Sequence, residues 1–195
     1  NSKRNGRGQI WRMDLEGKNM RQMTEGESDV SNARLLADGQ TLIYQASVPP
    51  LGWVLMKKSG DGSLKRLTDM EVGSWDVSPD EKLVAYAAQN RETKKMKTFV
   101  CPLEGGAPLK VFDIDPNRTL RWTRDGKALT FDIARGDSGE IVLQPLEGEK
   151  KTLASFAADR FFWFDWSFDG KTFACIRGKH LTDVIVINTE DNMPK

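Results

Sequence analysis

The sequence contains few of the residues that most often carry enzymatic chemistry. Its 195 residues include a single histidine, His180. A Ser-His-Asp triad would have to use it, and a lone histidine in a Gly-Lys-His loop is far more often a surface residue than a base. The Gly-x-Ser-x-Gly turn that positions the nucleophile of many hydrolases is also missing. The sequence therefore predicts that the chain is not an enzyme and has no catalytic residues.

Cysteine is almost as scarce as histidine, which excludes a disulfide framework. Cys101 and Cys175 each lie in an apolar, strand-like run, so we predict that both are small buried hydrophobic residues. They could not form a zinc site with His180, because the three residues are scattered over two repeats of the chain. A Gly-rich phosphate loop and the spacing of a calcium loop are absent as well. The sequence predicts no bound metal and no cofactor.

Neither an excess of one charge nor a long hydrophobic run is present. Lys plus Arg number 29 against 28 Asp plus Glu, a net charge of +1, so the chain has little overall attraction for nucleic acid. The apolar runs fall short of the ~18 residues that a membrane-spanning helix needs. We therefore expect no nucleic-acid partner and no membrane insertion. The basic start, residues 1–8, is typical of a piece cut from a longer protein.

What the sequence does have is an internal repeat of about 43 residues. Four turns contain an aspartate followed by an apolar run, and successive aspartates are separated by 42, 45 and 44 residues. A second turn, mostly Leu-Glu-Gly, recurs between these, and a strand-like run precedes each copy. The aspartates of the first turn are Asp38, Asp80, Asp125 and Asp169.

The chemistry of the repeat indicates antiparallel β-structure. Asp-Gly is a strong hairpin signal, because glycine adopts positive φ at little cost and aspartate is well tolerated in turns. Strands separated by turns every 8–12 residues, without a sustained 3.6-residue period, predict an all-β fold with few helices. A four-stranded sheet repeated every 40–50 residues is the blade of a β-propeller. The sequence thus predicts an all-β propeller.

The repeat also predicts how far the propeller extends. The chain is expected to form one partial propeller over residues 1–195, with about four to five blades of four-stranded antiparallel sheets and 17 strands. The first and last blades are incomplete, which favours an arc of a larger ring. Open blade edges are a liability, so we expect a missing segment or a second copy of the chain, in a homodimer, to pair with them. The predicted boundaries are a partial blade at 9–25, whole blades at 30–69, 72–112 and 116–154, and a partial blade at 160–189 that includes a strand at 183–187.

Two stretches resemble a known family of repeats. Residues 166–171, Trp-Ser-Phe-Asp-Gly-Lys, are similar to the Trp-Ser-Pro-Asp-Gly-Lys signature of TolB-like/WD-like β-propellers, and residues 76–80 are a second copy. Residues 120–127 and 141–148 resemble blades carried C-terminally by some bacterial serine/threonine kinases, where a membrane span separates kinase and propeller. The resemblance implies a non-catalytic binding or sensor module of a larger bacterial protein, located in the periplasm or elsewhere outside the cytoplasm, with a protein or small-molecule ligand.

The same repeats leave an alternative open. They also occur in the gating propellers of prolyl-oligopeptidase-type serine peptidases, where the catalytic domain would be absent from this chain. The multi-histidine site of related lyases cannot be assembled from His180 alone. The sequence also departs from the family at Glu81, which replaces the turn glycine and predicts about 1 kcal/mol of strain if this residue adopts positive φ.

The aligned repeats single out one charged position. Four residues before each turn aspartate, the sign alternates from blade to blade, and this position lies on the strand expected to be innermost. These residues could form inter-blade ion pairs with charged atoms within ~4 Å, or they could be a ring that contacts a ligand in the channel mouth. They are Arg34, Asp76, Arg121 and Asp165.

The most aromatic stretch of the chain is residues 161–166. Burial between blades would explain most of these rings. Because exposed aromatic side chains favour interfaces, one or two of them could instead form a contact surface. The candidates for such contact aromatics are Phe162 and Trp163.

Overall fold

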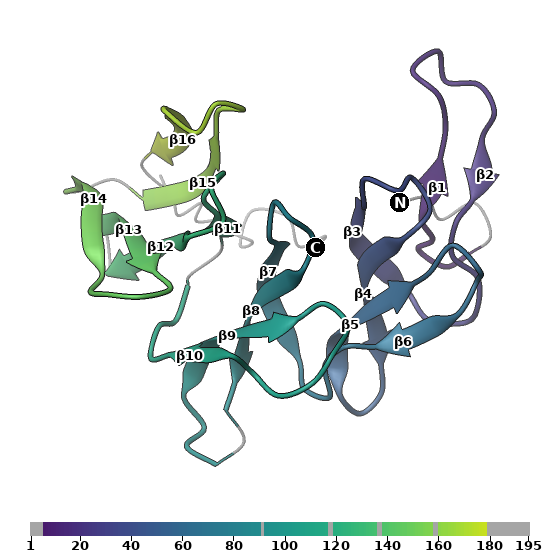
Figure 1. Cartoon of the computed structure of the whole chain (residues 1–195), viewed down its shortest axis with the longest axis horizontal. Helices are drawn as coiled ribbons and strands as arrows, with labels where there is room; N and C mark the ends of the chain where they lie inside the picture. The colour runs from purple at the N-terminus through teal and green to yellow at the C-terminus, as the bar shows by residue number, and fades with distance from the viewer. Residues whose placement is uncertain (1–5, 91, 117–118, 136–137, 158–159, 179–195) are drawn as a thin grey trace, which may run out of the picture.

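The computed structural model describes residues 6–90, 92–116, 119–135, 138–157 and 160–178 (Figure 1). In these ranges the chain forms sixteen strands and no helix, which confirms the prediction of an all-β fold. The expected strand at 183–187 and His180 lie outside the described residues.

Three antiparallel sheets each contain four strands that follow one another along the chain. The first comprises β3 (Val30–Leu35), β4 (Leu42–Val48), β5 (Gly52–Lys58) and β6 (Leu64–Arg66). The second comprises β7 (Val72–Val77), β8 (Leu83–Gln89), β9 (Met96–Pro102) and β10 (Lys110–Phe112). The third comprises β11 (Leu120–Trp122), β12 (Ala128–Arg135), β13 (Ser138–Pro145) and β14 (Lys151–Phe156).

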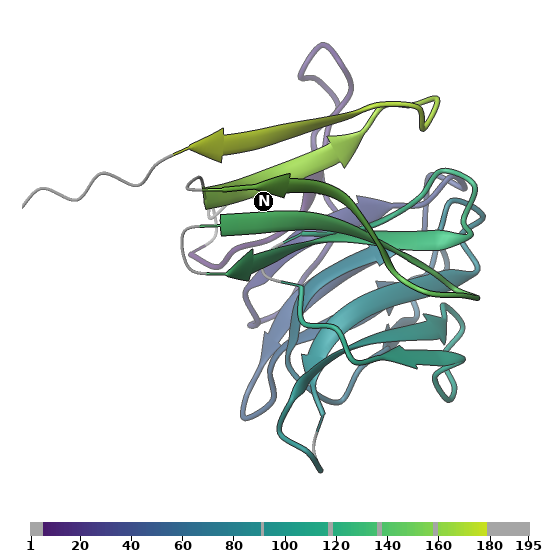
Figure 2. The same ribbon diagram turned by 90° about the vertical axis from the view of Figure 1, so that its left-hand side faces the viewer.

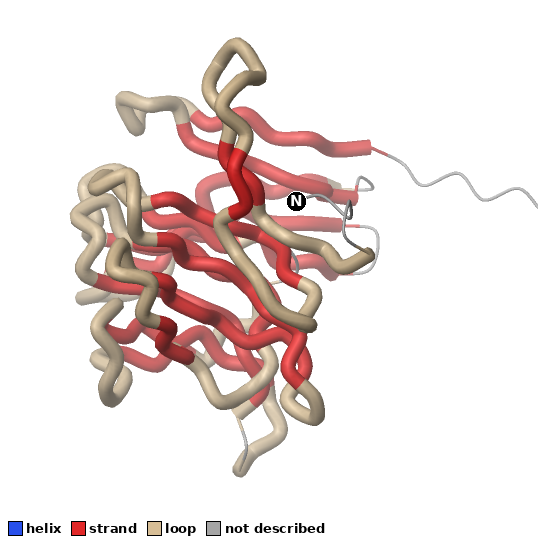
Figure 3. Tube along the Cα trace, turned by 90° about the vertical axis from the view of Figure 1, so that its right-hand side faces the viewer, coloured by secondary structure: helices blue, strands red, loops and turns tan. Residues whose placement is uncertain are grey.

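Two further sheets of two strands each precede and follow these three. The one that precedes them consists of β1 (Trp11–Arg12) and β2 (Arg21–Gln22), whose connecting loop projects beyond the neighbouring sheet (Figure 3). The one that follows them consists of β15 (Arg160–Trp166) and β16 (Phe173–Gly178). Figure 1 shows the sheets arranged in an arc with β3, β7, β11 and β15 toward its middle. The described residues therefore form a partial propeller.

The hydrophobic core lies between the sheets. Ile43 and Leu55 of the first sheet pack with Val84 and Phe99 of the second. Two other clusters do the same between the second and third sheets and between the third sheet and β15. Figure 2 shows these sheets stacked as successive layers. Because β4 and β8 are buried on both faces, they read as nearly continuous apolar runs, as expected for sheets packed face to face.

The turn that joins the first two strands is built in a similar way in four of the five sheets, those that begin with β3, β7, β11 and β15. In three sheets a Ser or Thr two residues before the aspartate donates its hydroxyl hydrogen bond to the carboxylate. In the first sheet Leu36 occupies that position, and Thr41 donates to Asp38 instead. The backbone amide two residues after each aspartate donates a further hydrogen bond. These bonds stabilise the ionised carboxylates and lower the pKa of all four.

Replacing Asp80, Asp125 and Asp169 together with asparagine should flatten the acid unfolding of the chain. The carboxylates stabilise the fold fully above their unfolded pKa of about 3.9, and this contribution is lost as the pH falls through their lower folded pKa values. An amide oxygen can still accept the hydroxyl hydrogen bond but carries no charge, so near pH 7 the variant should be less stable than the unaltered chain, and the two stabilities should converge as the pH falls. The midpoint of urea unfolding, followed from about pH 6 to pH 2, measures the effect. Parallel pH curves for the variant and the unaltered chain would contradict this account.

Glu81 adopts a φ of 58°, which confirms the positive φ considered for this turn. Its carboxylate accepts a hydrogen bond of 2.8 Å from the backbone amide of Ala37, in the turn of the preceding sheet. A glycine could not form this contact. The side chain that causes the backbone strain therefore also connects two neighbouring turns.

The two cysteines differ in burial. Cys101 is buried, and its Sγ lies 3.6 Å from the hydroxyl oxygen of Tyr86. Cys175 is only partly buried, beside the pair formed by Ile141 and Phe164. The prediction of two buried cysteines is thus confirmed for Cys101 and wrong for Cys175, because β16 is covered less completely than β9.

Candidate functional site

The innermost strands are distorted where they approach the middle of the arc. The register of β3 shifts between Ser31 and Arg34, and that of β7 shifts between Val72 and Trp75. A similar shift interrupts the pairing of β15 with β16. Bulges of this kind redirect side chains and are common beside functional sites. Here they precede the charged position that the repeat alignment singled out.

A cavity of about 740 Å³ opens at the middle of the arc. It is lined mainly by the inner strands, and its size falls within the range of small-molecule sites. Three arginines and three aspartates lie in its wall, so the formal charges of the lining cancel. They are Arg34, Asp76, Asp115, Arg121, Arg124 and Asp165. Three tryptophans also lie in the wall: Trp75, Trp122 and Trp166.

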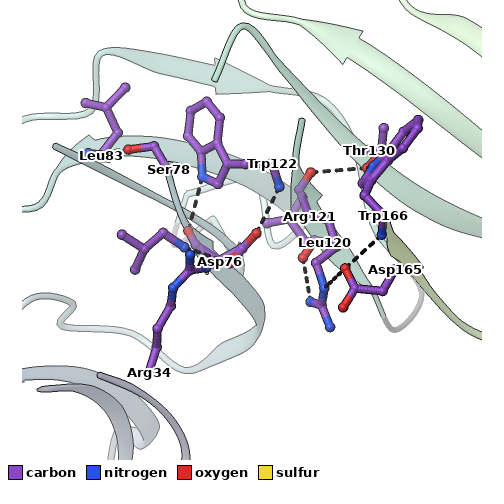
Figure 4. A network of polar contacts seen from close by, with 11 residues as sticks. Arg34, Asp76, Ser78, Leu83, Leu120, Arg121, Trp122, Thr130, Asp165 and Trp166 are labelled. Atoms are coloured by element: carbon purple, nitrogen blue, oxygen red, sulfur yellow. Dashed lines mark hydrogen bonds and ion pairs between the residues drawn. The ribbon is translucent and has the colours of Figure 1, made fainter. Parts of the chain in front are cut away.

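The first charged pair in the cavity is closed. Nη1 of Arg34 lies 2.5 Å from Oδ1 of Asp76, on the neighbouring sheet. The same oxygen accepts the amide hydrogen bond of Val77, and Oδ2 accepts that of Trp122, at 2.9 Å, from the third sheet. With only 13% of its side chain exposed, Asp76 joins three consecutive blades (Figure 4).

The second charged pair is looser. Nε of Arg121 lies 3.7 Å from Oδ1 of Asp165, a distance at which the two ions attract but form no hydrogen bond. Arg121 donates to the backbone carbonyl of Leu120, and Oδ1 of Asp165 accepts the amide hydrogen bond of Trp166. The side chains are 27% and 45% exposed. Figure 4 shows the two pairs along the same row of inner strands.

Two tryptophans tie the inner strands β11 and β15 to the sheets that precede them. The indole Nε1 of Trp122 donates to the backbone carbonyl of Asp76 at 3.2 Å. The indole Nε1 of Trp166 donates to the hydroxyl of Thr130 at 2.9 Å, and that hydroxyl donates in turn to the carbonyl of Arg121. The tryptophan three residues before the turn aspartate therefore has a structural role: it holds neighbouring blades in register beside the cavity.

Burial raises the pKa of Asp76 above its usual value. The amide of Trp122 and the guanidinium of Arg34 act in the opposite direction, because both favour the ionised carboxylate. Asp76 is therefore a largely buried carboxylate whose hydrogen-bond donors oppose the effect of burial on its pKa.

The structure brings all four charged residues of the aligned position to one cavity, in two pairs within 4 Å. Phe162 and Trp163 are not among the described residues that line it. Trp163 is 40% exposed on β15, and Phe162 is partly buried beside Gly178.

Two further residues of the wall are Arg124 and Ser74. Arg124 directly precedes the turn aspartate Asp125 and was not predicted to lie at the cavity. The hydroxyl of Ser74 is buried and has no hydrogen-bond partner among the described residues. Ser74 stands two positions before Asp76 on the strand expected to be innermost, so the repeats place it beside the channel, but they do not predict that its hydroxyl is buried.

The described part of the chain lacks both a cluster of metal ligands and a helix that could span a membrane. It holds no group of three or more His, Cys, Asp or Glu side chains that could bind a metal ion. In the same ranges, no helix is long and apolar enough to cross a membrane.

Comparison with known proteins identifies the fold. No protein-family model matches the sequence, and no curated protein matches it significantly. Among solved structures, the structure of putative TolB from Agrobacterium tumefaciens has a TM-score of 0.65 and 17% identity, over 92% of this chain and 68% of that one. The crystal structure of TolB from Acinetobacter baumannii has a TM-score of 0.59 and 20% identity, over 72% of this chain.

The fold is a partial β-propeller similar to those of the two TolB structures. At these identities the likeness concerns the fold alone. The aligned region is 36% of the length of the Acinetobacter protein, so this chain spans little more than a third of it.

Proposed function

We propose that the chain is a non-catalytic binding module that contacts a protein or small-molecule ligand through its central cavity. One observation carries this proposal: a single cavity collects charged side chains and tryptophans from four successive sheets of the arc. A concave site with a few converging polar groups is where a ligand binds by default. The repeated position that lines it is also the one whose charge alternates along the sequence.

The state of the charged groups favours binding over catalysis. Asp76 already accepts three hydrogen bonds and so is poorly placed to take a proton from a substrate. Arginine stays protonated at any ordinary pH, so Arg34, Arg121 and Arg124 can donate hydrogen bonds but not act as bases. Such groups recognise polar ligands and fix their orientation.

We further propose that the module belongs to a larger bacterial protein and works outside the cytoplasm as a sensor. The resemblance of residues 120–127 and 141–148 to kinase-associated propellers supports this setting, because those propellers follow a membrane span.

Filling the cavity should abolish ligand binding. Ala33 is exposed and lines the cavity, so Ala33→Phe would occupy the space without disturbing the core. A library of soluble metabolites and short peptides would be screened by the change in tryptophan fluorescence, since three tryptophans line the cavity. We expect saturable ligands that Ala33→Phe weakens by about tenfold or more, a loss of at least 1.4 kcal/mol.

Ala107→Phe is the matched control, because Ala107 is exposed in a turn outside the cavity. It should bind every ligand as the unaltered chain does. Mass spectrometry should recover each ligand chemically unchanged. Ligands that bind Ala33→Phe undiminished, or that are converted to products, would contradict the proposed function.

A further inference from the structure

The cavity contains one charged pair that is complete and one that is not. Asp76 uses both of its oxygens, on Arg34 and on the amides of Val77 and Trp122. Arg121 and Asp165 stand 3.7 Å apart without a hydrogen bond between them. Both pairs occupy the same position of the repeat. At Arg121 and Asp165, therefore, the wall of the cavity holds charged groups that do not hydrogen-bond to each other.

Arg121 and Asp165 have hydrogen-bond donors and an acceptor that the described chain does not use. A guanidinium carries five N–H donors, and Arg121 gives one hydrogen bond within the described chain, to the carbonyl of Leu120. Asp165 accepts one hydrogen bond there, from the amide of Trp166, on Oδ1. Its Oδ2 accepts none from the described residues. Since both side chains are partly exposed, a ligand can reach donors and an acceptor at adjacent points.

Charge balance limits what such a ligand can be. A ligand with a single charge would bind one member of the pair and leave the other without its counter-ion. A ligand that carries both charges could replace one weak contact by two charge-assisted hydrogen bonds, with every charge still paired. The lining as a whole is neutral, with three arginines against three aspartates, so it favours neither net anions nor net cations.

The rest of the wall indicates the remainder of the ligand. Trp166, which is partly exposed, directly follows Asp165 in β15 and lines the same cavity. Trp122, which follows Arg121, is only 4% exposed and so offers a ligand little surface. Trp75 lies in the wall as well, and the unpartnered hydroxyl of Ser74 is beside it. Indole rings offer apolar and aromatic surface for an uncharged side chain.

We propose that the cavity binds a free α-amino acid with an apolar or aromatic side chain. Its carboxylate would bind the guanidinium of Arg121, and its ammonium would bind the carboxylate of Asp165. Its side chain would contact Trp75 and Trp166. This inference rests on the proposed function and names the ligand class of the same cavity.

Titration of the complete chain with L-phenylalanine, followed by isothermal calorimetry, tests the assignment. Two analogues each remove one charge from the ligand and leave the protein unaltered: N-acetyl-L-phenylalanine lacks the ammonium, and L-phenylalanine amide lacks the carboxylate. We expect saturable binding of L-phenylalanine and affinities about tenfold lower for each analogue, because each loses one charge-assisted hydrogen bond.

Variants on the protein side should reproduce these losses. Arg121→Gln replaces the guanidinium by a shorter neutral amide, and Asp165→Asn keeps the shape of the side chain but removes its charge. Each should weaken binding by about tenfold. The control Lys110→Gln removes a positive charge, as Arg121→Gln does. Nζ of Lys110 lies 2.5 Å from Oε1 of Glu147, in an ion pair between the second and third sheets that is not part of the cavity lining. Lys110→Gln should leave the affinity unchanged.

Three results would overturn the assignment: no saturable binding of L-phenylalanine, equal affinity for the blocked analogues, or full affinity in both charge-removing variants. If other library compounds still bound in a manner that Ala33→Phe abolishes, the amino-acid assignment alone would fail. If no compound were sensitive to Ala33→Phe, the proposed function would fail with it.

Discussion

Replacing Asp76 with alanine should lower the free energy of unfolding by about 3 kcal/mol. The carboxylate accepts hydrogen bonds from Arg34, from the amide of Val77 and from the amide of Trp122. Alanine would leave the partly buried amide of Trp122 and one guanidinium without an acceptor, and the cost of such orphaned donors exceeds the value of the original bonds. Urea unfolding followed by tryptophan fluorescence measures the loss.

Asp165→Ala is the matched control for this prediction. It occupies the same repeat position, but its ion pair with Arg121 is longer and more exposed. Exposed pairs contribute little, so we expect a loss below about 1 kcal/mol. Removing both partners of the closed pair, in Arg34→Leu with Asp76→Leu, should cost less than the sum of the single changes. Equal losses for Asp76→Ala and Asp165→Ala would show that the two pairs do not differ as described.

The fold could be predicted from the sequence because its signals are local. A hairpin turn needs residues that tolerate its backbone angles, and Asp-Gly supplies them wherever the turn recurs. The same reasoning located the charged position, since aligned repeats place equivalent residues on equivalent strands. The positive φ of Glu81 was predictable for the same reason: the turn geometry is repeated even where its glycine is replaced.

The closed and open states of the two charged pairs could not be predicted in this way. Whether Asp76 is satisfied depends on the amide of Trp122, 46 residues later in the chain. The bulges in β3 and β7, which have no clear sequence signature, set how the inner strands meet at the cavity. The exposure of Trp163 likewise depends on the register shift in β15, because both faces of that strand are apolar.

Replacing Phe164 with alanine should remove about 4 kcal/mol of stability from the last described sheet. Phe164 is fully buried on β15, packs against Ile141 of the third sheet and makes an edge-to-face contact with Phe173. Truncation would open a cavity in the apolar cluster that joins β15 and β16 to β13 and β14. In stacked repeats each unit is held by its nearest neighbours, so the damage should be local.

Hydrogen exchange separates a local loss from a global one. In Phe164→Ala, the amides of β15 and β16 should exchange much faster. The amides of β4 and β8, which belong to the two four-stranded sheets farther from β15, should keep their protection. Phe168→Ala is the control: Phe168 lies in the turn of the same hairpin but is 94% exposed, so its loss should stay within about 0.5 kcal/mol. Equal deprotection of every sheet in Phe164→Ala would mean that the arc unfolds as one cooperative unit, contrary to the nearest-neighbour packing seen between its blades.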